Sequence, residues 1–193
     1  MDYGGFVAPM VLPGTYTVKL KVGDKDYTNQ LVMVHDTKNK LFSEEDRKAQ
    51  YTAAMELYHM HEQLADLVDK ISAEQKTLKD NMDSVKRPQT RKLMKEYNEK
   101  LEELRSTLLA TKHKSIFADE KKLREYITEV YGAICGQESK PTNLQLERIT
   151  VLNDDLKKGQ DNYLKLYADY GEKADKTVKD EKAKNKVEPR NSN

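Results

Sequence analysis

The sequence predicts a mainly α-helical protein: an elongated antiparallel helical bundle, with three arms and a broken middle arm or with four helices, preceded by a short β-hairpin. Three observations predict this class. Apolar and polar residues alternate strictly in one stretch near the N-terminus. Apolar residues recur at spacings of three and four over most of the rest of the chain. Charged residues make up 35% of the 193 residues and hydrophobic ones 37%, which suits helices with solvated outer faces.

The hairpin is predicted by alternation on both sides of a turn. Apolar residues occupy every second position from Tyr16 to Val22, after the turn signal at Pro13. Gly23-Asp24 suits a two-residue turn, and pairing across it brings residues of the next strand onto the same face. Because two strands alone are marginal in water, we expect this face to be covered by the helices, by another copy or by further strands. The candidate interaction residues are Tyr16, Val18, Leu20, Val22, Tyr27, Leu31 and Met33.

A long helix is predicted over residues 43–85. Ser43 followed by three acidic residues resembles a capped helix start. Two rows of a heptad pattern then predict the buried side of this helix, which we call the seam. Tyr51, Tyr58 and Ala65 are expected to widen it. The two rows are Ala54, His61, Val68, Gln75 and Met82, and Leu57, Leu64, Ile71, Leu78 and Val85.

Three further helical stretches follow. Pro88 suits the first turn of a second helix, whose predicted buried residues run from Met94 to Leu108. Another helix is expected from about Asp119 to Gly136, and a last one begins at a capping box of Thr142 and Gln145 and ends near Gly171. Residues 112–118 form either a turn or only a break, and this choice separates four arms from three.

The predicted organisation has three zones. Residues 1–36 hold the hairpin, and residues 43–171 hold the helical bundle. Residues 172–193 are almost entirely polar, with Val178 and Val187 as the large apolar exceptions, and we expect a disordered tail there.

Composition argues against several classes of protein. No apolar run is long enough to span a membrane, and no signal peptide opens the sequence, so a chain complete as written is expected in the cytoplasm. Lys and Arg number 34 and Asp and Glu 33, so no overall positive charge attracts nucleic acid. The single cysteine, Cys135, cannot form a disulfide within the chain.

The sequence provides no recognisable catalytic, metal or cofactor site. His61 and Glu62 begin a zinc-protease motif, but Ala65 stands where the second histidine ligand is required. Glu56 and His59 have di-iron spacing without a second such pair. Cys135 lies in an apolar context that does not activate a thiol. We therefore expect a chain that is not an enzyme.

The hairpin residues resemble the closing strands of an immunoglobulin-like module; they are 11–20 (VLPGTYTVKL), 23–28 (GDKDYT) and 31–34 (LVMV). Such strands occur near the C-terminus of large bacterial secreted proteins that carry sortilin-like β-propellers of BNR (Asp-box) repeats and are often labelled glycosyl hydrolases. In those proteins a helical region follows the strands, and two helical stretches of this sequence are similar to it: 123–125 (LRE) to 131–132 (YG), then 140–142 (KPT) with 145–148 (QLER).

The resemblance implies an accessory role rather than a hydrolase site. Asp-box repeats need Trp, and the chain has none, so the propeller is absent and no catalytic residue is carried over. The chain is then expected to be a C-terminal module of an exported protein in the periplasm, on the outer surface or outside the cell, with the propeller and the other strands as partners. The alternative is a freestanding helical scaffold or adaptor that self-associates as a homodimer.

Overall fold

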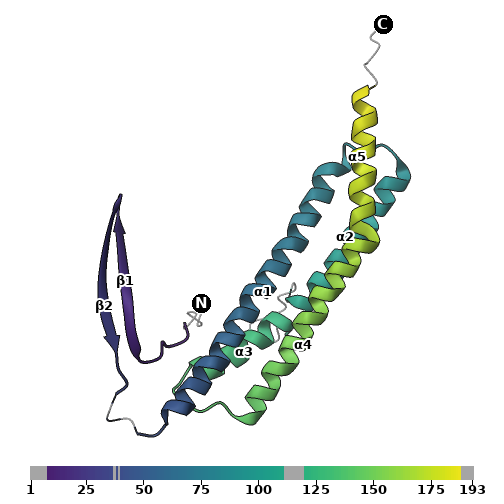
Figure 1. Cartoon of the computed structure of the whole chain (residues 1–193). Coiled ribbons are helices and arrows are strands. Elements are labelled where there is room, and N and C mark those ends of the chain that lie inside the picture. The colour runs from purple at the N-terminus through teal and green to yellow at the C-terminus, as the bar shows by residue number, and fades with distance from the viewer. Residues whose placement is uncertain (1–7, 37, 39, 111–119, 188–193) are drawn as a thin grey trace. The chain divides into compact units, whose positions relative to one another are not determined.

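The computed structural model describes residues 8–36, 38, 40–110 and 120–187. It is 69% helical, and in its described part four helices follow one two-stranded antiparallel hairpin, which confirms the predicted fold class (Figure 1). The fourth helix is continuous through a π-helical turn. The elements are β1 (Gly14–Val22), β2 (Lys25–Met33), α1 (Glu44–Met82), α2 (Pro88–Leu108), α3 (Leu123–Cys135), α4 (Asn143–Leu166), η1 (Tyr167–Gly171) and α5 (Glu172–Val187).

The break between the second and third helices makes them separate elements. Leu109 has an extended backbone, and residues 120–122 are also non-helical. The expected helix start at Asp119 and the polar stretch 112–118 lie outside the described residues. Within the described chain α3 begins at Leu123 and ends one residue before Gly136.

The chain divides into two compact units. Unit 1 comprises residues 1–58 and 129–149, and so holds the hairpin, the first turns of α1, the end of α3 and the start of α4. Unit 2 comprises residues 59–128 and 150–193. Each unit is described by itself below.

In unit 1 the hairpin has the predicted register. Val22 pairs with Lys25, Leu20 with Tyr27 and Tyr16 with Leu31. Gly23 has a φ of 61° and Asp24 a negative φ, which is the pattern of a type II′ turn with glycine at its first central position. The twist of this turn matches that of paired strands, so the turn and the alternating pattern specify the same register.

The predicted cap at Ser43 and the predicted capping box at Thr142 both form in unit 1. The backbone N–H of Ser43 donates to the Asp46 carboxylate at 3.1 Å, and the backbone N–H of Asp46 donates to the Ser43 hydroxyl at 3.1 Å. At the start of α4 the Thr142 N–H donates to the Gln145 side chain at 2.8 Å, and the Gln145 N–H returns a bond of 3.2 Å. These reciprocal bonds satisfy N–H groups that the helix itself leaves without partners.

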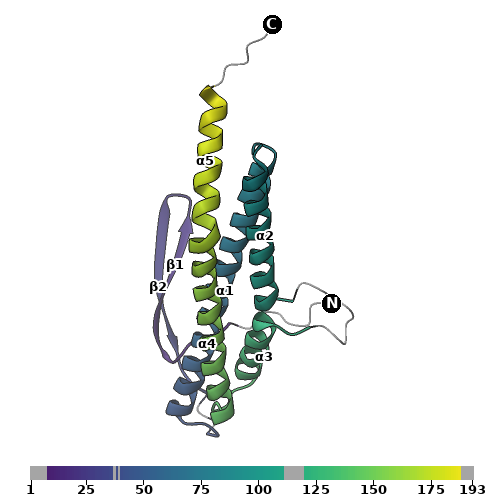
Figure 2. The same ribbon diagram turned by 90° about the vertical axis from the view of Figure 1, so that its right-hand side faces the viewer.

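In unit 2 three helical segments run alongside one another: the second part of α1, then α2, and the continuous helix from α4 to α5 (Figures 1 and 2). The seam row from Leu64 to Val85 is buried as predicted. The second row differs, because Met60 and Leu67 are buried, whereas His61, Val68, Gln75 and Met82 are half-buried and Ala65 is exposed. Met60 and Leu67 lie on the opposite side of the row from Leu64 to Val85. The buried face of α1 in unit 2 therefore includes them in place of the second predicted row.

The predicted faces of α2 and α4 also form the core of unit 2. In α2 the whole predicted row is buried: Met94, Tyr97, Leu101, Leu104 and Leu108. In α4 Leu152 and Leu156 are 1% exposed, and a Cβ atom at Gly159 would lie 2.9 Å from the Leu108 side chain. Glycine at position 159 therefore allows α2 to approach α4 closely. No described helix is long and apolar enough to cross a membrane.

The expected disordered tail after Gly171 is wrong for residues 172–187, which form α5. Ala174 and Val178 are buried, and Glu181 is buried too, at 4% exposure. The Glu181 carboxylate accepts hydrogen bonds from the backbone N–H groups of Lys86 and Arg87 and from the Thr90 hydroxyl. The buried carboxylate of Glu181 thus adds polar contacts to the packing of Ala174 and Val178, the two buried apolar residues of α5. Residues 188–193 of the predicted tail lie outside the described chain.

Candidate interaction surface

The hairpin places all seven predicted interaction residues on one face. Direct partners across an antiparallel pair share a face, and the register pairs Tyr16 with Leu31, Leu20 with Tyr27 and Gly14 with Met33. All seven side chains are exposed, from 36% at Tyr16 and Met33 to 60% at Leu20. In unit 1, as the structure describes it, this face is an uncovered apolar surface.

The opposite face of the hairpin is polar. In β1 it carries Thr and Lys at alternate positions, and in β2 it carries polar residues with one apolar exception, Val32. The Lys19 ammonium lies 2.7 Å from the Asp26 carboxylate on this side. The hairpin is therefore amphipathic, with one face suited to water and the other suited to burial against a second surface.

A side-chain hydrogen bond fixes the entry into the hairpin. The Tyr16 hydroxyl donates to the backbone carbonyl of Leu12 at 2.6 Å. The bond spans the Pro13-Gly14 turn and holds the chain against the start of β1. Sequence reasoning assigned Tyr16 to the apolar face and missed this second role, although a tyrosine placed just after a Pro-Gly turn is a usable signal.

A cavity of about 430 Å³ lies in unit 1 where the chain enters and leaves the hairpin. Leu12 and Met33 contribute apolar lining from the hairpin ends, and Ala54 of α1 and Ile134 of α3 contribute it from the helices. Arg47 adds a charged group to the lining. This cavity was not predicted, because its lining comes from segments far apart in the sequence.

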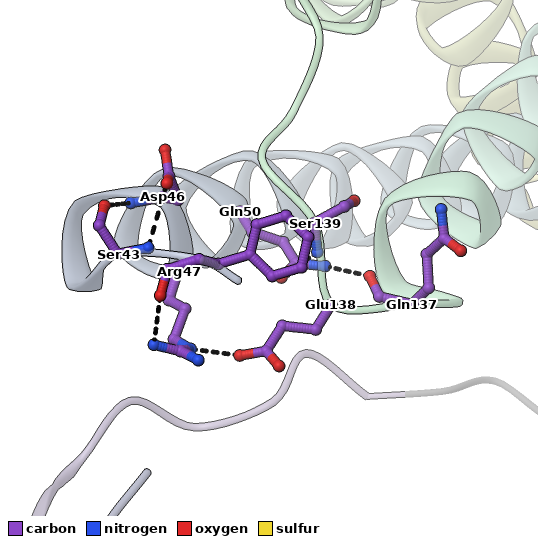
Figure 3. Close-up of polar contacts among 8 residues, drawn as sticks. Ser43, Asp46, Arg47, Gln50, Gln137, Glu138 and Ser139 are labelled. Carbon is purple, nitrogen blue, oxygen red and sulfur yellow. Dashed lines mark hydrogen bonds and ion pairs between the residues drawn. The ribbon is translucent and has the colours of Figure 1, made fainter. Parts of the chain in front are cut away.

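A polar network joins the start of α1 to the loop after α3 (Figure 3). The Arg47 guanidinium forms an ion pair with Glu138 and donates to the Phe42 carbonyl at 2.8 Å. The Gln50 amide donates to the carbonyls of Ile134 and Gln137, both at 2.6 Å. Since Gln50 is 8% exposed, these bonds satisfy a buried amide and fix the helical wall of the cavity.

Electrostatics at the start of α1 stabilise the ionised form of one carboxylate. The hydrogen bond from the backbone of Ser43, and then the Lys140 ammonium at 3.2 Å, hold the pKa of Asp46 below its ordinary value. An ionised Asp46 accepts the capping bond and also interacts favourably with the positive end of the helix dipole.

Burial disfavours the charged forms of His61 and Cys135. Burial, followed by the nearby positive charge of Arg124, lowers the pKa of His61, so its neutral form is favoured. His59 contacts Glu62, with 2.9 Å between Nδ1 and Oε2. Burial raises the pKa of the Cys135 thiol, which disfavours the reactive thiolate. In the part of the chain that the structure describes, no three His, Cys, Asp or Glu side chains are grouped to hold a metal ion.

Tyrosines divide between the core and the surface. In unit 2 Tyr97 is fully buried and stacks on Tyr170 with ring centroids 6.2 Å apart and planes at 4°. Tyr163 of α4 is half-buried, and in unit 1 Tyr51 of α1 is half-buried as well. Tyr58 is 40% exposed, which corrects its expected place in the seam, because the buried stripe of α1 turns away from it.

No family model, no curated protein and no solved structure matches this chain. The geometry of the hairpin itself therefore carries the functional reasoning. It combines a two-faced sheet, an exposed apolar side and an entry fixed by Tyr16. Exposed apolar surface of this kind is typical of contact with another protein surface.

Proposed function

We propose that this chain is a noncatalytic accessory module of a larger exported sortilin-like β-propeller protein. Its hairpin supplies two strands of an immunoglobulin-like sandwich, and its helices dock or space the propeller. One observation carries the proposal: the hairpin is fully formed, yet its whole apolar face is exposed. A sheet with one apolar face is completed by packing a second sheet against it.

The energetics of the hairpin support a missing partner. Two strands without a covering layer are marginal in water, and apolar burial contributes about 25 cal/mol per Å². The seven apolar side chains, from Tyr16 to Met33, contribute little of this stabilisation while they stay exposed. A second sheet over them would supply it.

The Tyr16–Leu12 hydrogen bond supports the kind of sandwich. In immunoglobulin-like domains a tyrosine near the start of a late strand donates its hydroxyl to backbone a few residues upstream. Tyr16 does this at the start of β1, with a bond of 2.6 Å to Leu12. The arrangement agrees with the resemblance of residues 11–20 to closing strands of such a module.

A second candidate is a freestanding scaffold that self-associates. The same exposed face favours it, because two copies could bury Val18, Leu20 and Leu31 against each other. The two candidates differ in the mass of the native polypeptide. An antibody against residues 43–170 should detect, in fractionated source cells, an extracytoplasmic band several times heavier than 22.3 kDa. A band at 22.3 kDa would favour the scaffold.

Substitutions test whether the apolar face is used at all. Val18→Asp with Leu20→Asp places charges on the apolar face, and Thr17→Asp with Thr28→Asp places them on the polar face. We expect the first pair to abolish association in the native polypeptide or between copies, and the second pair to leave it intact. Sedimentation of both variants measures this, and equal behaviour would exclude the apolar face as the contact.

A further inference from the structure

The two free edges of the hairpin present specific backbone groups. In a hairpin closed by a two-residue turn, the pair next to the turn exchanges both hydrogen bonds, and such pairs alternate with pairs that exchange none. Val22 and Lys25 are the pair next to the turn. The residues that exchange backbone hydrogen bonds across the hairpin are therefore those whose side chains lie on the apolar face. The outward N–H and C=O groups therefore belong to the polar-face residues: Thr15, Thr17, Lys19 and Lys21 in β1, and Asp26, Thr28, Gln30 and Val32 in β2.

The edge of β2 is blocked at its centre. The backbone N–H of Gln30 points outward by this rule, and it donates to the Asn29 side-chain oxygen at 2.9 Å. A further strand on β2 would have to displace that bond. Occupied or covered edge groups are a common way in which proteins prevent strand addition. In the described chain no side chain occupies the outward N–H groups of β1 from Thr15 to Lys21.

Charge also distinguishes the edge of β1. Lys19 forms an ion pair with Asp26, and Lys21 is the direct cross-strand partner of the same aspartate. The polar face thus carries two lysines in β1 and one carboxylate, Asp26, in β2 opposite them, which leaves positive charge beside the edge of β1. A neighbouring strand with an acidic residue across from Lys21 would balance it.

We propose that the free edge of β1, residues 15–21, accepts a further strand from the larger polypeptide. That strand has apolar residues at alternate positions, on the side of Tyr16, Val18 and Leu20, and Thr or acidic residues at the positions between. The edge of β2 is the outer edge of the completed sheet. The inference rests on the proposed function, because it identifies which edge joins the sandwich and what chemistry the joining strand has.

The test uses this chain and synthetic peptides of the length of β1. One peptide alternates Val with Thr and Glu, and its matched control carries Lys in place of Glu. Amide hydrogen exchange by NMR is measured at the outward groups of both strands. We expect the Glu peptide to slow exchange of the β1 amides from Thr15 to Lys21 and to leave those of Thr28 and Gln30 unchanged. Opposite-charge pairs across strands are worth about 0.2–1 kcal/mol each, so the Lys peptide should bind several-fold more weakly.

Paired proline variants separate the two edges. Thr17→Pro removes an outward donor from β1, and Gln30→Pro removes one from its cross-strand partner in β2. The first should abolish protection by the peptide, and the second should leave it intact. Lys21→Glu keeps every backbone donor and should reverse the preference between the Glu and Lys peptides, so the proposal stays testable if a proline variant does not fold.

Several outcomes would overturn the proposal. Protection of the β2 amides, equal protection of both edges, or no saturable protection would exclude β1 as the receiving edge. Protection that grows with protein concentration in the absence of peptide would make a second copy the occupant. A different measurement tests the proposed function. Substitution of Val18 and Leu20 reports whether the apolar face of the hairpin is buried, whereas the exchange experiment reports only which strand edge receives the peptide.

Discussion

The Thr90 hydroxyl of α2 donates a hydrogen bond of 2.6 Å to the Glu181 carboxylate of α5. Both side chains are buried, at 3% and 4% exposure. The carboxylate also accepts from the backbone N–H groups of Lys86 and Arg87, at 3.0 and 3.4 Å. One side chain of α5 thus accepts from two backbone N–H groups just before α2 and from a hydroxyl in its first turn.

We expect Thr90→Val to lower the melting temperature and to make it less dependent on pH. The hydrogen bond from Thr90 is the largest cause that lowers the pKa of Glu181. A lowered pKa contributes stability above the ordinary value of 4.5, and this contribution is lost as pH falls toward the folded-state pKa. Thermal unfolding from pH 7 to pH 3 should therefore show the variant and the parent converging in acid. Thr128→Val removes an exposed hydroxyl of α3 and is the matched control.

Local signals predicted the hairpin, whereas α5 depends on contacts distant in sequence. The period of two and the Gly23-Asp24 turn specify the register of β1 and β2 without reference to the helices. By contrast, Glu181 in a lysine-rich stretch has the pattern of a solvated helix or coil. Its partners lie about 90 residues earlier, so no window of sequence contains both.

The candidate interaction surface likewise has one part that local sequence signals predict and one part that depends on contacts distant in sequence. The apolar face of the hairpin is a period-two pattern, and all seven of its residues could be selected from sequence. The cavity of unit 1 could not, because Leu12 and Ile134 line it from distant segments. Within α1 the heptad pattern predicted the buried row that contains Ile71. Packing against the neighbouring helices decides whether Met60 or His61 is buried beside this row.

We expect Ile71→Ala to cost about 2–5 kcal/mol of unfolding free energy, because it leaves a cavity in a packed helix interface. Ile71 is fully buried in unit 2. Val151→Ala is the control, since Val151 is 45% exposed and surface substitutions usually change stability by less than about 0.5 kcal/mol. Urea unfolding measures both. Equal losses would show that Ile71 does not lie in a packed core.

Alanine should have opposite effects at two helical glycines. In α3 a Cβ atom at Gly132 meets nothing within 4 Å, so Gly132→Ala should stabilise the protein by about 0.5–1 kcal/mol through helix propensity. At Gly171 the Cβ would lie 2.5 Å from Cδ2 of Tyr167 and 2.9 Å from the hydroxyl of the fully buried Tyr97. Gly171→Ala should therefore destabilise. Two stabilising substitutions in urea titrations would mean that the rings of Tyr167 and Tyr97 can move aside.

The Cys135 thiol should react slowly with iodoacetamide at neutral pH. Burial raises its pKa above the ordinary value of 9.0, so the thiolate fraction at pH 8 is smaller than in a free cysteine peptide. A hydrogen bond with Tyr131 acts in the opposite direction and lowers that pKa. Tyr131→Phe should therefore slow alkylation further at fixed pH and move the midpoint of the rate profile upward.

Unfolding in urea removes both effects on the thiol, so the unfolded parent, the unfolded Tyr131→Phe variant and a cysteine peptide should react at the same rate. The comparison separates the thiol pKa from simple access, because a blocked thiol stays slow at every pH, whereas a raised pKa only shifts the profile. A folded protein that alkylates as fast as the peptide at pH 8 would contradict the raised pKa that burial gives the Cys135 thiol.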